Sequence, residues 1–192
     1  MENTNEINDE TIKTKKILMV IAPSDFRDEE LFETKKIFEE EECRVDVCSC
    51  DTGKIRGMLH SVFNVSLKIT DANVCDYDAV VFVGGIGVEK HKLYKNLEYI
   101  DLAKEANLLN KTIGAICLAP KILAGADLLI SKRATVHISA KEYLHSKGAI
   151  FVNKNVVVDR NIVTGNGPSA IEEFALAISN KIKKFDKAKV KL

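Results

Sequence analysis

The stretch TIGAICLAPKILAGA, residues 112–126, predicts a buried strand that passes directly into a helix. Its first five residues, Thr112–Ile116, are small or apolar, as in a short strand covered on both faces of a sheet. The helix expected over Leu118–Ala126 carries Pro120 in its first turn, where the missing N–H costs nothing. Cys117 stands at the turn between strand and helix, among small residues, which is the pattern of a nucleophile elbow.

The position of Cys117 has a chemical consequence. At such a turn the sulfur lies near the start of a helix, where unpaired N–H groups and the helix dipole favour the thiolate over the thiol. A small apolar cysteine in a buried strand is also common, and it then has only a structural role. This stretch by itself leaves both interpretations open.

The rest of the chain alternates between strand and helix patterns. Strands are predicted over Lys16–Ala22, Arg44–Ser49, Asp78–Val83, Thr112–Ile116, Ala149–Val152, Val156–Asp159 and Ile162–Thr164. Helices are predicted over Asp28–Glu42, Leu97–Leu109, Leu118–Ala126 and Pro168–Lys184, with a small β excursion over Lys54–Ile69. Alternation of this kind predicts an α/β fold: a single-domain three-layer sandwich, flavodoxin-like, with a mostly parallel, doubly wound sheet and helices on both faces.

Composition limits the class of protein. The chain has 192 residues, of which 46% are hydrophobic and 29% charged, enough for one sizeable core. We expect a polar arm at residues 1–14, one α/β domain at 15–184 and a basic tail at 185–192. Lys plus Arg balance Asp plus Glu at 28 each, which argues against nucleic acid or an anionic membrane surface as a partner.

Apolar runs, the N-terminal residues and the spacing of the cysteines indicate the compartment and whether a metal site is expected. No apolar run approaches the length of a membrane span, and the acidic N-terminus is unlike a signal peptide, so a cytoplasmic location is expected. The five cysteines form neither a CxxC pair nor a zinc-ligand spacing. We therefore expect free thiols and no metal site.

Two further features follow predicted strands, and the carboxyl ends of parallel strands are where α/β sheets place their sites. Gly84 and Gly85 come after Val83 and let backbone N–H groups approach a ligand closely. One of them, with the amide of Leu118, is suited to an oxyanion hole, although a plain tight turn explains the pair equally well. The spacing is not GxGxxG, so a dinucleotide site is not expected.

The other feature is the acidic loop at the start of the first predicted helix. Asp28, Glu29 and Glu30 suit a helix N-terminus, and one of them is also a candidate to turn inward toward the sulfur. The residues alone do not select which. Among the histidines, His137 is the one that ends an apolar alternation at a predicted strand terminus, near the other candidates.

Together these motifs resemble the ThiJ/PfpI superfamily, in particular its Parkinson-disease deglycase branch, within the class I glutamine amidotransferase-like fold. The matching segments are FRDEEL (26–31), FVGG (82–85), GAICLAPKILAGADLL (114–129), SKRATVHIS (131–139) and TGNGPSAIEEFALAI (164–178). The resemblance implies that Glu30 hydrogen-bonds the cysteine and that His137 is the active-site histidine. It also implies catalytic Cys117, an oxyanion hole of Gly85 and Leu118, and Gly84 in the substrate pocket.

Two positions depart from the superfamily patterns. Protease-like members carry histidine directly after the cysteine, where this chain has Leu118, so protease activity is not expected. The deglycase branch has an arginine near the closing turn, where this chain has Asn166. A dimer contact or anion site that depends on that arginine is therefore not carried over.

The function implied is cysteine-dependent chemistry on small 2-oxoaldehydes such as methylglyoxal or glyoxal, or on their adducts, without a cofactor. On this hypothesis the protein is a glyoxalase-like or deglycase-like enzyme and a homodimer. The alternative is an oxidative-stress sensor or chaperone whose Cys117 is oxidised to sulfinate without turnover. If Glu30 hydrogen-bonds a Cys117 thiolate, we expect Glu30 to be protonated, because two adjacent anions are unfavourable.

Overall fold

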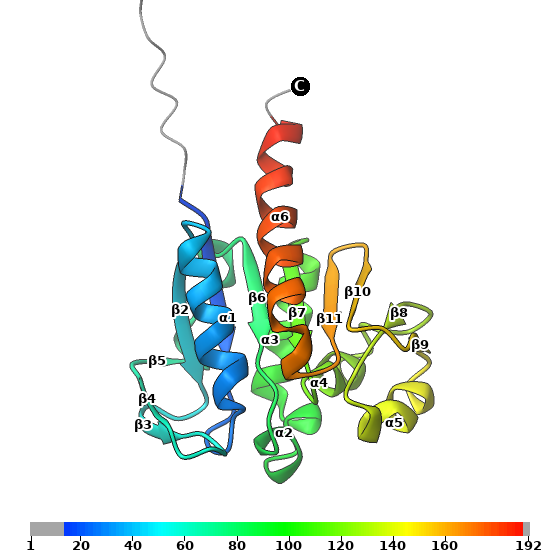
Figure 1. Ribbon diagram of the computed structural model, residues 1–192, viewed down its shortest axis with the longest axis horizontal. Helices are drawn as coiled ribbons and strands as arrows, with labels where there is room; N and C mark the ends of the chain where they lie inside the picture. Colours follow the sequence, from blue (N-terminus) through cyan, green and yellow to red (C-terminus); the bar gives the residue numbers. More distant parts are fainter. Residues whose placement is uncertain (1–13, 190–192) are drawn as a thin grey trace, which may run out of the picture.

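The computed structural model describes residues 14–189 (Figure 1). The predicted polar arm, residues 1–14, lies outside this range apart from its last residue, and so does the end of the predicted basic tail. The backbone of residues 185–189 continues the last helix, α6 (Ile171–Lys189). Among the described residues, no helix is both long and apolar enough to cross a membrane.

A seven-stranded sheet forms the centre of the molecule, in the order β10-β11-β7-β6-β1-β2-β5. Its strands are β1 (Lys16–Val20), β2 (Arg44–Ser49), β5 (Leu67–Lys68), β6 (Ala79–Phe82), β7 (Thr112–Ile116), β10 (Val156–Asp159) and β11 (Ile162–Gly165). All neighbouring strands are parallel except β10, which pairs antiparallel with β11 at one edge. The predicted fold class is therefore confirmed.

Helices cover both faces of this sheet (Figure 1). Besides α6 they are α1 (Asp28–Glu40), α2 (Gly87–Lys90), α3 (Leu97–Leu108), α4 (Pro120–Gly125) and α5 (Lys141–Ser146). Short 3₁₀ turns occupy Ile69–Asp71 (η1), Val74–Asp76 (η2), Leu93–Lys95 (η3), Ile138–Ala140 (η4) and Pro168–Ala170 (η5). In Figure 1, α1 and α6 lie side by side in front of the sheet.

Alternation along β1 shows how the two faces are filled. Ile17 and Met19 enter the core that contains Phe174 of α6, whereas Leu18 and Val20 enter the core on the other face. Successive side chains of a strand point to opposite faces, so a strand covered on both sides must be apolar at every position. This is why the segment from Lys16 onward is a nearly continuous apolar run.

Two smaller pairs of strands lie outside the main sheet. β3 (Gly53–Arg56) and β4 (Val62–Val65) form an antiparallel hairpin, which matches the β excursion expected over Lys54–Ile69. β8 (Arg133–Ala134) and β9 (Ile150–Phe151) form a short parallel pair, so the strand expected over Ala149–Val152 is only two residues long. Each pair forms a separate two-stranded sheet and adds no strand to the main one.

The order of the strands determines where a site can form. β1 is followed along the chain by its neighbour β2 on one side, whereas β6 lies on its other side and leads on to β7. The direction of winding thus reverses between β1 and β6, and ligands of open α/β sheets bind outside the strand carboxyl ends at such a point. The three loops singled out in the sequence follow β1, β6 and β7.

Candidate functional site

Cys117 occupies a strained turn between β7 and α4. Its φ is +60°, a left-handed conformation that costs a non-glycine residue about 1–2 kcal/mol. Two backbone hydrogen bonds hold the turn: Cys117 N–H donates to the Gly165 carbonyl at 2.9 Å, and its carbonyl accepts from His137 N–H at 2.8 Å. α4 begins at Pro120, two residues later than the helix predicted over Leu118–Ala126, and only 7% of Cys117 is exposed.

Glu30 reaches this cysteine from the first turn of α1. The side chain is fully buried, and its Oε2 accepts a hydrogen bond from Gly84 N–H at 3.0 Å. A Cβ added to Gly84 would lie 2.6 Å from Glu30 Oε2 and 2.7 Å from the Cys117 Cβ. Both distances are far below van der Waals contact. The absent side chain of Gly84 is therefore what lets the carboxyl and the thiol approach each other.

The pKa of Cys117 is raised by its surroundings. Burial raises the pKa of the Cys117 thiol to about 12, and the negative charge of Glu30 and its hydrogen bond act in the same direction. Hydrogen bonds from the N–H groups of Gly85 and Leu118 lower that pKa, but less than burial raises it. Burial of the sulfur therefore opposes the thiolate that the start of the helix favours, and α4 is only six residues long.

The pKa of Glu30 is also raised by its surroundings. Burial raises its pKa to about 7, and its hydrogen bonds with Cys117 and Gly84 and the charge of Arg27 act against that rise. Its other oxygen, Oε1, is buried without a hydrogen bond of ordinary geometry. Glu30 and Cys117 also affect each other's pKa through their hydrogen bond. Near neutral pH, moving one proton from the thiol to Glu30 gives a thiolate beside a carboxylic acid with no change in net charge.

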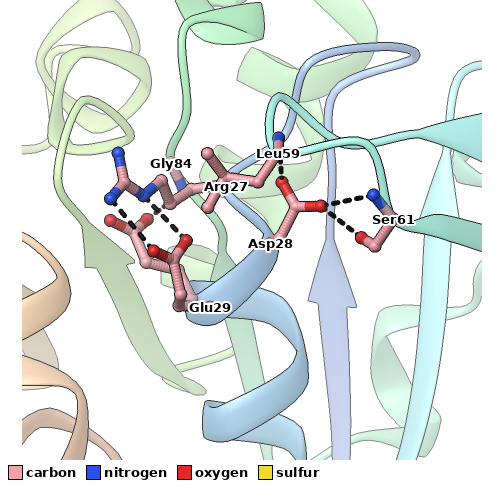
Figure 2. Close-up of polar contacts among 7 residues, drawn as sticks. Arg27, Asp28, Glu29, Leu59, Ser61 and Gly84 are labelled. Carbon is pink, nitrogen blue, oxygen red and sulfur yellow. Dashed lines mark hydrogen bonds and ion pairs between the residues drawn. The ribbon is translucent and has the colours of Figure 1, made fainter.

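The three acidic residues of this loop have three different partners. Asp28 accepts hydrogen bonds from Leu59 N–H at 2.7 Å and Ser61 N–H at 2.9 Å, as well as from the Ser61 hydroxyl. Figure 2 shows this carboxylate turned toward the loop between β3 and β4, whereas Glu29 lies beside Arg27. Of the three, only Glu30 lies against Cys117.

Arg27 is a residue of this region that the sequence analysis did not select. Its Nε donates to Glu29 at 2.9 Å, and its backbone N–H donates to the Gly84 carbonyl at 2.9 Å. The hydrogen bond with Glu29 raises the pKa of Arg27, and the negative charges of Glu30 and Cys117 add to the effect. The one available signal was its position inside the acidic loop, which does not distinguish it from a solvated arginine.

His137 joins the site through its backbone. The backbone N–H holds the Cys117 carbonyl, whereas the exposed imidazole has its Nδ1 2.8 Å from the Ser139 hydroxyl. His137 is one of the residues that line a pocket of about 240 Å³, together with Asn166, Gly167 and Pro168. Its catalytic role stays a prediction.

Asn166, which stands where the resemblance places an arginine, is held by the loop before β10. Its backbone N–H donates to the Asn155 carbonyl at 2.9 Å, and its Nδ2 donates to the Asn155 side chain at 3.2 Å. Its Oδ1 is buried and has no hydrogen-bond partner. The position is therefore occupied by a neutral amide that is hydrogen-bonded to Asn155 of the same chain.

A metal centre has no obvious ligands in the described part of the chain. Residues 14–189 contain no group of three or more His, Cys, Asp or Glu side chains close enough to hold an ion. The cysteines of this range are all free, with Cys43, Cys48 and Cys117 buried and Cys75 exposed.

The sheet is doubly wound, and a cysteine stands on an elbow after one of its strands, with a buried glutamate and backbone amides beside the sulfur. These features define a class of α/β proteins with a cysteine at a strand-to-helix turn. Within that class, the chain belongs to the DJ-1/PfpI family, whose match covers residues 15–181. The resemblance to the ThiJ/PfpI superfamily is thereby confirmed.

Individual relatives agree with this assignment. An uncharacterised protein of Methanocaldococcus jannaschii is 45% identical over 95% of this chain and 89% of its own length. A deglycase of Pyrococcus abyssi is 30% identical over 79% of this chain and 90% of its own. The crystal structure of a ThiJ/PfpI domain protein from Brachyspira murdochii matches with a TM-score of 0.86 and 34% identity, over 90% of this chain and 98% of the other.

Proposed function

We propose that the protein carries out cysteine-dependent, cofactor-independent glyoxalase-type or deglycase-type chemistry on small 2-oxoaldehydes or their adducts. The observation that carries the proposal is the pairing of buried Glu30 with Cys117 across Gly84, with two backbone amides at the sulfur. Relatives named as deglycases support the same class of reaction.

The first step would use Cys117 and Glu30 together. As the sulfur attacks the aldehyde carbon of methylglyoxal, Glu30 accepts the thiol proton, and the C=O bond becomes an alkoxide held by the amides of Gly85 and Leu118. Glu30 then returns the proton to the alkoxide oxygen and gives a hemithioacetal. A pKa of about 7 suits a group that must both accept and release a proton near neutral pH.

The following steps would convert the hemithioacetal without an external oxidant. Glu30, assisted by His137, removes the proton from the former aldehyde carbon and delivers it to the neighbouring carbonyl carbon, while the hydroxyl proton passes to the neighbouring carbonyl oxygen. The product is a thioester of a 2-hydroxy acid. Water cleaves this thioester, which releases lactate from methylglyoxal and regenerates the thiol.

Product formation tests this proposal. We expect purified protein to convert methylglyoxal to lactate, or glyoxal to glycolate, without added thiol, metal or nicotinamide. Cys117→Ala should abolish the conversion, and Cys75→Ser, which removes an exposed thiol, should leave it unchanged. Equal rates in wild type and Cys117→Ala would refute the proposal.

A second candidate function has its own support in the same pair. A carboxylic acid that is partly protonated at neutral pH can donate a hydrogen bond to a cysteine sulfinate, so Glu30 suits a peroxide sensor as well. Intact mass and peptide mapping after mild peroxide treatment distinguish the two functions. Two added oxygens at Cys117, together with no turnover of aldehyde, would favour the sensor. Oxidation confined to Cys75 would exclude it.

A homodimer and a cytoplasmic location are further proposals, and both come from the sequence and its family resemblance. Light scattering coupled to size-exclusion chromatography tests the first: a mass of about twice 21.3 kDa is expected, and a monomer at micromolar concentration would contradict it. Cell fractionation of the native organism tests the second.

A further inference from the structure

Lys121 is a buried cation close to the elbow that the proposed chemistry does not use. It follows Cys117 by one helical turn, and only 8% of its side chain is exposed. Its ammonium donates a hydrogen bond to the carboxylate of Glu89. The same ammonium lies 3.9 Å from the ring centroid of Tyr94 and 4.7 Å from that of Tyr143.

The partners of Lys121 come from the helical segments that follow two different strands, β6 and β8. Glu89 belongs to α2, which begins two residues after Gly85 at the end of β6, and Tyr94 belongs to η3, directly beyond it. Tyr143 belongs to α5, which follows His137 and η4. One ammonium group therefore ties together the segments that carry the glycine pair, the cysteine elbow and His137.

The groups around this ammonium are closely packed against one another. The rings of Tyr94 and Tyr143 contact each other with centroids 5.0 Å apart. A Cβ added to Gly125 of α4 would lie 2.2 Å from the Tyr94 carbonyl oxygen, so α4 and η3 are in direct contact. The backbone N–H of Lys121 donates to the Leu118 carbonyl at 3.1 Å. This bond closes the turn that presents the Leu118 amide.

Stability alone is a poor explanation for a buried lysine at this place. Removing an ammonium from water is costly, and apolar side chains of similar volume often replace buried ion pairs without loss of stability. A methionine would fill the same space between two tyrosine rings. What only a cation provides is a directional attraction to one carboxylate and two ring faces at once, and that sets the relative positions of three segments.

We propose that Lys121 is a positioning residue for the Cys117 site. Through Glu89, Tyr94 and Tyr143 it fixes the amides of Gly85 and Leu118, and the segment of His137, relative to the sulfur. It does not touch the reacting atoms. The proposal deepens the proposed function and rests on it for its kinetic readout, whereas the reactivity of Cys117 tests it independently of any turnover.

The experiment compares Lys121→Met with Lys121→Arg, with Lys36→Met as a matched control. Lys36 forms an ion pair with Glu40 on the exposed face of α1, and 75% of its side chain is exposed. Urea unfolding and circular dichroism first establish that each variant folds. Two readouts follow: the pH profile of Cys117 alkylation by iodoacetamide, followed by peptide mass spectrometry, and kcat and KM for methylglyoxal.

For Lys121→Met we expect folded protein, kcat reduced about tenfold or more, KM within about threefold of wild type, and an alkylation profile shifted to higher pH. The shift is expected because displaced amides stabilise the thiolate less. Lys121→Arg, which keeps the charge and the affinity for ring faces, should restore most of both readouts. Lys36→Met should change neither.

A folded Lys121→Met with wild-type kcat and a wild-type alkylation profile would overturn the proposal and leave Lys121 a packing residue. If Lys121→Met does not fold, Glu89→Gln replaces it, because this change removes the charge pair and keeps the shape. The same two readouts then apply, with the same expected direction. If wild type shows no turnover at all, the proposed function fails, and the alkylation profiles alone decide the role of Lys121.

Discussion

Glu30 and Cys117 meet across Gly84, where Glu30 raises the pKa of the thiol, whereas the hydrogen bond with Cys117 lowers the pKa of Glu30. The carboxylate holds the Gly84 N–H at 3.0 Å, and the Cys117 Cβ lies beside the place where a Gly84 side chain would be. Burial raises the pKa of the thiol to about 12 and that of Glu30 to about 7. The pair therefore holds at least one proton throughout the neutral range, and its reactive form requires that proton to move to Glu30.

The first prediction concerns Glu30→Gln, which removes the negative charge and keeps the shape. The pKa of Cys117 should fall, because the charge of Glu30 helps to raise it, and each unit of decrease gives about ten times more thiolate at a fixed pH below that pKa. Alkylation of Cys117 by iodoacetamide should therefore be faster than in wild type. Turnover of methylglyoxal should nevertheless fall by about 10²–10⁴-fold, because the group that transfers protons is gone.

These two opposite changes separate Glu30→Gln from a general loss of structure. Glu33→Gln, an exposed position on the same helix, is the control and should leave alkylation and turnover unchanged. Slower alkylation in Glu30→Gln would show that the carboxylate does not raise the pKa of the thiol.

The second prediction is a pH dependence of stability that comes from Glu30. Its folded-state pKa of about 7 lies above the ordinary value of 4.5, so the folded protein binds a proton that the unfolded chain has lost. This contribution to stability is complete below about pH 4.5 and is lost as the pH rises through about 7. The difference corresponds to about 3 kcal/mol.

Urea unfolding of wild type and Glu30→Gln at several pH values measures this effect. The free energy of unfolding of the variant, relative to wild type, should rise by about 3 kcal/mol between pH 4.5 and 8. A constant difference across that range would mean that Glu30 titrates normally in the folded protein.

The third prediction concerns Gly84→Ala. The added methyl group has no room between Glu30 and Cys117, so we expect a loss of about 1–3 kcal/mol of stability and a large loss of turnover. Gly114→Ala in β7 is a useful comparison, because its Cβ would instead crowd Ile178 at 2.6 Å, inside the core. Both variants should be less stable to urea. Only in Gly84→Ala should the alkylation rate of Cys117 no longer depend on the charge of Glu30. Equal turnover in the two variants would contradict this.

The fourth prediction assigns Asp28 a structural role. Asp28→Ala leaves the N–H groups of Leu59 and Ser61 without their acceptor, and we expect about 1–3 kcal/mol of destabilisation. The alkylation profile of Cys117 should stay that of wild type, because Asp28 faces the hairpin loop (Figure 2). Ser61→Ala, which removes one of the same contacts, should show a smaller loss of stability. A changed profile in Asp28→Ala would show that this loop supports the cysteine.

Much of the fold follows from local patterns in the sequence. Arg44–Ser49 and Thr112–Ile116 are strands with the predicted bounds. The first begins with alternating polar residues and valines, and the second is a short run of small or apolar residues, and both patterns are typical of strands. The elbow at Cys117 was predictable for a similar reason: small residues and Pro120 permit a sharp strand-to-helix turn. Each of these features depends on residues that are adjacent in the chain.

The sequence by itself thus determined the strand order along the chain, the elbow and a set of candidate residues at strand ends. It did not determine what each acidic residue of the first helix does. Asp28, Glu29 and Glu30 are chemically alike and adjacent, and successive helical positions point about 100° apart. Only the packing of the 57–61 loop, of Arg27 and of Gly84 around them gave each a different partner.

Protonation was also decided by the tertiary structure. The start of a helix favours a thiolate, and that argument is local, whereas burial acts through every atom packed around the sulfur and here outweighs it. The same holds for Lys121, whose charge, seen in sequence, resembles that of any helical lysine. Only the fold brings Glu89, Tyr94 and Tyr143 to it, because Glu89 and Tyr94 follow β6 and Tyr143 follows β8, whereas Lys121 follows β7.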